Sequence, residues 1–189
     1  MESTMMDFQL TVSAIMRYGT TVFGDKEVVT CAGDQPSRRR TYAAVGERTA
    51  RLANALRSLG VDGDQRVGTF MWNNAEHLEA YLAIPAMGAV LHTLNIRLSA
   101  DQVGYIATHA GDHAVIVDAS LVPLFAKVLP YADTVKHVIV SGPADDEALA
   151  SLAGDGREVH SYEDLLAAAD RSSISGQSNE SEAAASSSS

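Results

Sequence analysis

Short runs of apolar residues alternate along this chain with longer stretches in which apolar side chains recur every three or four positions. The first pattern is typical of strands buried on both faces, and the second of amphipathic helices. The expected strands are residues 66–72, 90–94, 114–117 and 135–140. The expected helices are residues 12–22, 42–59, 75–87, 100–110, 119–129 and 162–168. Strands joined by helices indicate βαβ units, and therefore an α/β fold with a mainly parallel sheet and flanking helices.

Capping residues mark the ends of several of these helices. Thr41 and Asn74 stand where a side-chain oxygen accepts the first free backbone N–H groups, and Ser99 with Gln102 has the spacing of a capping box. Gly60 follows the last apolar position of its helix, where a left-handed residue ends many helices. The helix boundaries are therefore predicted from two independent signals, the apolar spacing and the caps.

The segments around this core are less regular. Two short segments, residues 27–31 and 38–41, flank the turn residues Gly33-Asp34 and predict a short N-terminal hairpin. Residues 141–158 are expected to form an acidic loop. Residues 172–189 contain nine serines and only one large apolar side chain, too little to offset the entropy lost on ordering. We therefore expect residues 1–169 to form one domain and residues 170–189 to be a disordered Ser/Ala-rich tail.

Composition excludes several classes of protein. The 189 residues are 46% hydrophobic and 20% charged, with a formal net charge of −10 and a single cysteine. One cysteine rules out a disulfide scaffold and favours a reducing compartment. No apolar run reaches the length of a membrane span. Residues 1–10 have neither a basic nor an apolar signal region, so we expect no secretory signal there. The excess of acidic residues argues against nucleic acid as a partner. We expect a cytoplasmic protein without a transmembrane segment.

A ligand of such a sheet would bind where the strands end, at their carboxyl edge. The expected ends are Trp72-Asn73-Asn74, Thr93-Leu94-Asn95, Val117-Asp118 and Ser141-Gly142. The glycine-rich phosphate loops G-x-x-x-x-G-K-[ST] and G-x-G-x-x-G do not occur. The Gly60–Gly63 segment precedes a strand and is interpreted as a turn. Asp118 could hold a ribose, but without a glycine loop a capping role is expected.

Metal-binding patterns are equally incomplete. His109 and His113 have the spacing of one helix face, but Gly111 lies between them where the helix should end. Glu76, His77 and Glu79 lie on one helix without a second histidine at the required spacing. We expect structural or solvated roles for these groups.

Nucleophile signatures are absent too. Ser141-Gly142 lacks the G-x-S-x-G pattern and is followed by Pro143. Cys31, in an apolar segment, is interpreted as a small core residue. The basic run Arg38-Arg39-Arg40 could contact a phosphate, but a solvated strand edge that discourages edge-to-edge pairing is the preferred interpretation.

Two long segments resemble the adenylate-forming (AMP-dependent) enzymes, which include acyl-CoA ligases, adenylation domains and luciferases. They are residues 41–67, TYAAVGERTARLANALRSLGVDGDQRV, and residues 72–118, which contain HLEAYLAIPAMGAVLHTLNIRL. Residues 72–118 resemble bacterial medium- and long-chain fatty-acid–CoA ligases in particular, and MMDFQLTV at 5–12 and TVKHVIV at 134–140 fit the same group. The resemblance covers residues 5–168 and implies the N-terminal subdomain of such a ligase.

The resemblance implies a two-step reaction in which a fatty acid and ATP, with Mg²⁺, form acyl-AMP, and coenzyme A then displaces AMP. Its phosphate loop, metal-directing acid and lysine lie beyond the matched segment, and residues 170–189 contain no lysine, threonine or glycine cluster. We therefore expect a chain truncated before the phosphate loop, by a frameshift or a shortened gene, and inactive alone. No catalytic, cofactor-binding or metal-binding residue is assigned. Asn95 and Arg97 match the family's N-x-R pattern, and we expect them to hold a loop.

Two other functions stay open. The resemblance to the long-chain branch implies homodimers formed through the N-terminal region, so the chain could be a non-catalytic module that pairs with itself or with an intact ligase. A free-standing flavodoxin-like nucleotide binder is the weaker alternative, because no glycine loop follows the first strand of the predicted parallel sheet.

Overall fold

A five-stranded parallel sheet forms the centre of the chain. The computed structural model describes residues 11–33 and 35–170. Its strands are β1 (Glu27–Ala32), β2 (Gln35–Thr41), β3 (Arg66–Phe70), β4 (Val90–Thr93), β5 (Asp112–Asp118), β6 (His137–Ser141) and β7 (Glu158–Ser161). Its helices are α1 (Val12–Val22), α2 (Tyr42–Ser58), α3 (Ala75–Ala86), α4 (Ala100–Ala110), α5 (Val122–Phe125), α6 (Asp146–Leu152) and α7 (Tyr162–Ala168).

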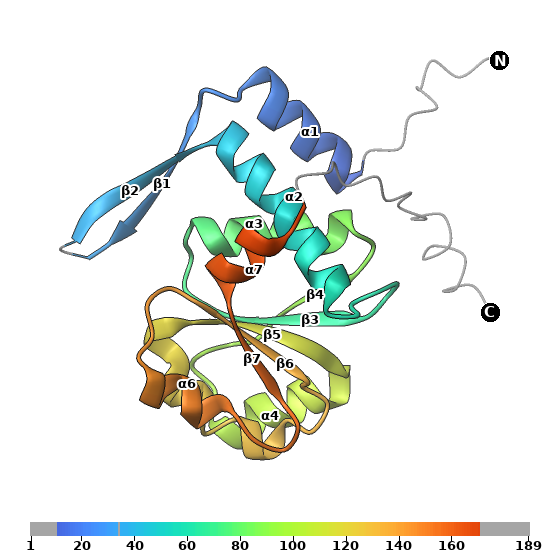
Figure 1. Cartoon of the computed structure of the whole chain (residues 1–189), viewed down its shortest axis with the longest axis vertical. Helices are drawn as coiled ribbons and strands as arrows, with labels where there is room; N and C mark the ends of the chain where they lie inside the picture. Colours follow the sequence, from blue (N-terminus) through green and yellow to red (C-terminus); the bar gives the residue numbers. More distant parts are fainter. Residues whose placement is uncertain (1–10, 34, 171–189) are drawn as a thin grey trace.

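The strand order in the sheet is β4-β3-β5-β6-β7, and every neighbouring pair is parallel. The register places Val67 of β3 beside Leu91 of β4 and Ala114 of β5, and Val138 of β6 beside Val115 and Val159. Strands β1 and β2 form a separate antiparallel hairpin that projects from the helices near α3 (Figure 1). The predicted α/β class, parallel sheet and N-terminal hairpin are confirmed.

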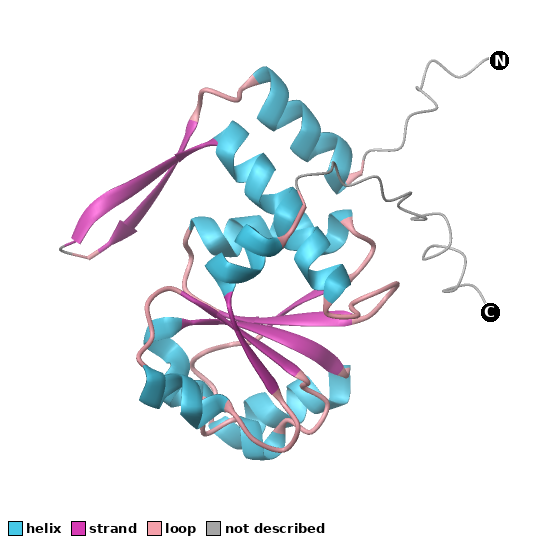
Figure 2. Cartoon of the chain, viewed as in Figure 1, coloured by secondary structure: helices cyan, strands magenta, loops and turns pink. Residues whose placement is uncertain are grey.

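Helices cover both faces of the sheet, so the molecule has three layers (Figure 2). On one face, α2, α3 and α7 bury a cluster that includes Leu52, Ile84 and Leu166. On the other, α4, α5 and α6 bury a second cluster that includes Phe125 and Leu152. Burial of each large aliphatic side chain contributes about 1.5–3 kcal/mol, so the two clusters supply the main driving force for folding.

Helix α2 follows the sequence signals closely. The Thr41 hydroxyl accepts a hydrogen bond from the backbone N–H of Ala44 at 3.2 Å, as an N-cap does. Leu52 and Leu56 are fully buried. Gly60 has a φ of +82°, the left-handed conformation expected just after the helix.

The structure differs from the sequence prediction between β5 and β6. Instead of one helix over residues 119–129, a 3-10 turn η1 (Ala119–Leu121), the four-residue α5 and a second 3-10 turn η2 (Leu129–Tyr131) follow one another. Pro123 and Pro130 lie at the starts of α5 and η2. Each proline lacks the N–H that a continuous helix would need, which explains the interruption.

The predicted acidic loop, residues 141–158, contains a helix, α6, and its last residue begins a strand that was not predicted, β7. Asp145 caps α6 by accepting a hydrogen bond from the N–H of Ala148 at 2.7 Å, and the acidic residues of the first turn face the positive end of the helix. Strand β7 is an edge strand with one neighbour, β6. An edge strand needs few apolar residues, so its sequence Glu-Val-His-Ser carries no clear strand pattern.

The predicted tail lies almost entirely outside the described residues, and its disorder stays a prediction. Among the residues that the structure does describe, there is no helix long and apolar enough to cross a membrane.

Candidate functional site

The carboxyl ends of β3, β5 and β6 meet at one cavity of about 750 Å³. Its lining includes Asn74, Asp118, Ser120, Ser141 and Gly142. Three of the four strand ends predicted to converge therefore do so. The fourth, Thr93-Leu94-Asn95, does not line the cavity, because β4 lies at the outer edge of the sheet beyond β3.

Asp118 organises the polar wall of this cavity. One carboxylate oxygen accepts hydrogen bonds from the backbone N–H and the hydroxyl of Ser120, at 3.0 and 2.7 Å. The other accepts from the side-chain amide of Asn74 at 3.2 Å, and the indole of Trp72 donates to the Ser120 hydroxyl at 3.1 Å. The capping role expected for Asp118 is thus confirmed, and the same side chain joins the ends of β3 and β5.

The Asn74–Asp118 hydrogen bond lies where the chain changes direction across the sheet. After β3 the chain adds β4 on one side and then returns to add β5 on the other. Ligands of open α/β sheets bind at such switch points, beyond the carboxyl ends of the strands. The cavity volume is in the range of small-molecule sites, so this is the candidate site.

A cluster of arginines and glutamates forms a second wall. The Arg38 guanidinium donates to both carboxylate oxygens of Glu76, at 2.8 and 2.9 Å, and Arg48 pairs in the same way with Glu163, at 2.9 and 2.6 Å. Burial pushes the pKa of Glu76 upward, but the hydrogen bonds from Arg38, a backbone hydrogen bond and the charges of Arg38 and Arg40 together leave that pKa below its ordinary value. Hydrogen bonding to Arg48 likewise lowers the pKa of Glu163.

Glu79 is the buried centre of the same cluster. Its side chain is fully buried and accepts hydrogen bonds from Arg40, from Arg48 at 2.9 Å and from the Tyr162 hydroxyl at 2.7 Å. Burial raises the pKa of Glu79 against the opposing effect of Arg48. Burial, together with the nearby Glu79, also holds the pKa of Tyr162 well above its ordinary value. The cluster joins the hairpin, α2, α3 and α7 through one carboxylate.

The interpretation of Arg38-Arg39-Arg40 as a solvated strand edge holds for Arg38 and Arg39, whose side chains are 59% and 61% exposed, and is wrong for Arg40, whose side chain is 21% exposed. Alternation along β2 directs Arg38 and Arg40 to the glutamates of α3, whereas Arg39 pairs with Glu27 of the neighbouring strand. Arg38 and Arg40 thus neutralise the buried carboxylates of α3.

His77, beside a smaller cavity of about 280 Å³ between β1 and α3, is fixed by two hydrogen bonds. One ring nitrogen is 3.1 Å from the carbonyl of Trp72 and the other is 3.0 Å from the hydroxyl of Thr69. Burial lowers its pKa, which favours the neutral ring. The structural role expected for His77 is confirmed.

The other residues singled out by the sequence lie apart from the cavity. His109 stacks on Tyr105, while His113, beyond the left-handed Gly111, lies beside His137. The two histidines therefore do not share a helix face.

Cys31 is exposed, so its interpretation as a core residue is wrong. The hairpin leaves one face of β1 open, and the neighbouring Thr30 faces inward instead, accepting a hydrogen bond from the N–H of Ala75 at 3.1 Å. Asn95 holds its loop as expected, since its side chain accepts from the backbone N–H of Arg97 at 3.0 Å. Gly60 and Gly63 both have positive φ and form a turn.

Neither the arginine–glutamate cluster nor a group formed by His137, Glu158 and His160 on β6 and β7 was predicted from the sequence. The spacing of Glu158 and His160 puts both on one face of a strand, but this signal depends on recognising β7. Within the described residues the carboxyl-edge cavity has no lysine in its lining, and its arginine is already paired with a glutamate.

Comparison with known proteins identifies the family. The model of the AMP-binding enzyme family matches residues 18–184. The chain is 44% identical over 138 residues to a long-chain-fatty-acid–CoA ligase of Thermus thermophilus, a match that covers 73% of this chain and 26% of the relative. It is 32% identical over 166 residues to a 3-methylmercaptopropionyl-CoA ligase of Ruegeria lacuscaerulensis, covering 88% of this chain and 30% of the relative.

A solved structure has the same fold. The anthranilate CoA ligase AuaEII, in complex with anthranoyl-AMP, superposes with a TM-score of 0.72 at 20% identity, covering 91% of this chain and 30% of that one. The chain thus spans about a third or less of the length of the proteins it matches. With the family model matching most of its residues, the chain belongs to the AMP-binding enzymes.

Proposed function

We propose that this chain is the N-terminal part of a fatty-acid–CoA ligase, which converts a fatty acid and ATP to acyl-AMP and then transfers the acyl group to coenzyme A. The observation that carries the proposal is the 44% identity to the Thermus thermophilus long-chain-fatty-acid–CoA ligase. In the complete ligase this part would provide the parallel sheet, whose carboxyl edge would form one wall of the active site.

The described residues do not fit ATP and Mg²⁺ by themselves. Acyl-phosphate chemistry needs cationic groups and a metal ion at the phosphates. The carboxylates at the cavity, Asp118, Glu76 and Glu163, are already engaged by hydrogen bonds or by arginine. Free negative phosphates would meet these acidic groups without an unpaired guanidinium to offset them. We propose that the 189-residue chain has no ligase activity alone.

Two assays test this proposal. The purified chain, given ATP, Mg²⁺, coenzyme A and fatty acids of different lengths, should release no pyrophosphate above a buffer control. In the second assay this chain replaces the matching segment of the Thermus thermophilus ligase, and the chimera should form long-chain acyl-CoA, while the ligase lacking that segment should not. Robust turnover by the chain alone would refute its inactivity, and an inactive but folded chimera would count against the proposed ligase role.

A second candidate function is supported by the surface of α1. No residue of this helix is buried, and Ile15, Tyr18 and Val22 expose 54%, 61% and 55% of their surface. Exposed apolar side chains gathered on one helix are typical of interaction sites. The chain would then pair with itself or with an intact ligase. Light scattering after size exclusion, alone and mixed with a full-length relative, tests this, and a monomer that never mixes would exclude it.

We also propose that the protein acts in the cytoplasm, in keeping with its single, exposed cysteine. In the complete enzyme its partners would be the fatty acid, ATP and coenzyme A.

A further inference from the structure

Three side chains that can bind a metal converge at the opposite end of the sheet from the carboxyl-edge cavity. His137 is the first residue of β6, Glu158 is the first residue of β7, and His160 follows two positions later. The parallel register sets His137 beside Glu158 and Ile139 beside His160. Because side chains two positions apart on a strand share a face, all three residues lie on the face of the sheet covered by α2, α3 and α7.

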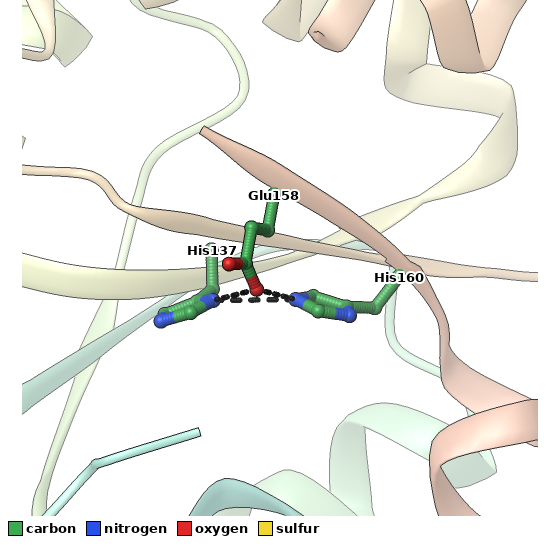
Figure 3. A group of neighbouring side chains, drawn as sticks. All are labelled: His137, Glu158 and His160. Carbon is green, nitrogen blue, oxygen red and sulfur yellow. Dashed lines mark hydrogen bonds and ion pairs between the residues drawn. The ribbon is translucent and has the colours of Figure 1, made fainter. Parts of the chain in front are cut away.

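The three potential ligand atoms point toward one another (Figure 3). The Nδ1 atom of His137 is 3.2 Å from the Nε2 atom of His160. One carboxylate oxygen of Glu158 is 3.5 Å from each of these nitrogens. Three atoms with lone pairs at such distances repel one another unless a proton or a metal ion lies among them.

These separations match the edges of a tetrahedral metal site. Zn²⁺ binds histidine nitrogen and carboxylate oxygen at about 2.0–2.2 Å, so two ligands in tetrahedral geometry are about 3.4 Å apart. In octahedral geometry the same bond lengths would bring neighbouring ligands to about 3.0 Å. A single ion can therefore lie about 2 Å from all three atoms without large movement of the strands.

We propose that His137, Glu158 and His160 bind one divalent transition-metal ion, with Zn²⁺ as the ion to test. Two imidazoles and one carboxylate form a donor set that zinc accepts, with the fourth position left for water. Solvent can reach the site, because the Glu158 side chain is 65% exposed while the two histidines are 14% and 19% exposed.

The bound ion would join the edge strand β7 to β6. Apart from its backbone hydrogen bonds to β6, the four-residue strand β7 packs only one apolar side chain, Val159, against the core. A ligand that binds the folded chain and not the unfolded one adds stability in proportion to the logarithm of its concentration. The site would therefore stabilise the fold, and it does not depend on the proposed ligase function.

Calorimetric titration of the full chain with ZnCl₂, using protein without a histidine tag and stripped by a chelator, tests the proposal. We expect one Zn²⁺ per chain and a melting temperature about 5–11 °C higher at a Zn²⁺ concentration 100 times the Kd. Co²⁺ should bind in its place and give the visible absorption of a four-coordinate ion.

Three variants locate the site. Glu158→Gln and His160→Gln should each weaken Zn²⁺ binding by about tenfold or more. His109→Gln, which removes an exposed histidine elsewhere, should bind Zn²⁺ as the wild type does. Glu158 is largely exposed, so its variant keeps the test valid if the loss of a histidine disturbs folding. Absence of Zn²⁺ binding by the wild type would show that the three groups share a proton only. Unchanged binding by Glu158→Gln and His160→Gln would place the ion elsewhere. Either result overturns the proposal.

Discussion

Replacing Glu79 by glutamine removes one negative charge from the centre of the arginine–glutamate cluster with little change in volume. In the wild type this fully buried carboxylate accepts hydrogen bonds from Arg40, Arg48 and the Tyr162 hydroxyl. In the variant, one oxygen becomes an NH₂ group that faces donors instead of accepting from them. The two guanidinium groups lose their shared counter-charge, and Arg48 keeps only Glu163 and Arg40 only Glu76 as a partner.

The expected loss in the free energy of unfolding is about 3 kcal/mol. Removing one partner of a buried ion pair costs about 3–5 kcal/mol. The lower end applies here, because the side chains of Arg40 and Arg48 are 21% and 20% exposed and can recover part of their hydration. Tyr162→Phe removes only the hydroxyl hydrogen bond to the carboxylate and should cost about 1.5 kcal/mol.

Urea denaturation followed by circular dichroism measures these losses. The matched control is Glu27→Gln, which makes the same substitution in an ion pair with Arg39 whose side chains are 44% and 61% exposed. It should cost about 0.5 kcal/mol or less. A loss in Glu79→Gln no larger than that in Glu27→Gln would refute the view that the buried carboxylate holds the cluster together.

Three further changes test other parts of the structure. Because the pKa of Glu76 is lowered in the folded chain, its stabilising effect is present above the ordinary glutamate value of 4.5 and is lost as the pH falls through the folded-state pKa. Urea titrations from about pH 7 to pH 3 should therefore show a shallower loss of stability for Glu76→Gln than for the wild type. Gly104→Ala should lower the free energy of unfolding by about 1–3 kcal/mol, seen as a lower melting temperature, because the added Cβ would come within 2.3 Å of the Cβ of Tyr131. Gly19→Ala, with open space around it, should stabilise α1 by up to about 1 kcal/mol. A stabilising Gly104→Ala would contradict the close packing of α4. The exposed thiol of Cys31 should react with a disulfide reagent as fast in the native chain as in urea, and a protected thiol would restore the core interpretation.

The sheet could be predicted because its central strands are buried on both faces. Residues 67–70 of β3 are buried, and β5 and β6 contain the apolar runs 114–117 and 138–140. Capping residues such as Thr41 and Asn74 mark the helices α2 and α3. The elements that were missed, β7 and α6, are short and lie at the edge or surface. Strand β7 is held by pairing with β6, and α6 by its cap at Asp145 and one fully buried residue, Leu152, which leave little trace in an apolar pattern.

The position of the candidate site was predicted from the sequence, but the side-chain contacts that line it were not. Parallel topology alone brought Asn74, Asp118 and Ser141 to one cavity. The partners of the arginines could not be inferred from spacing, because Arg38 and Glu76 are 38 positions apart and Arg48 and Glu163 are 115 apart. Such pairs depend on how helices pack, which no local signal specifies.

The hydrogen bond between Tyr162 and Glu79 spans 83 positions of the chain and has a consequence for biosynthesis. A ribosome releases α3, with its carboxylates, long before α7 emerges. Until then Glu79 lacks its hydroxyl donor and the face of the sheet that α7 covers stays open to solvent. Cotranslational folding of this face should therefore finish only after α7 leaves the exit tunnel, and nascent chains stalled before residue 162 should be more sensitive to protease than the 189-residue chain.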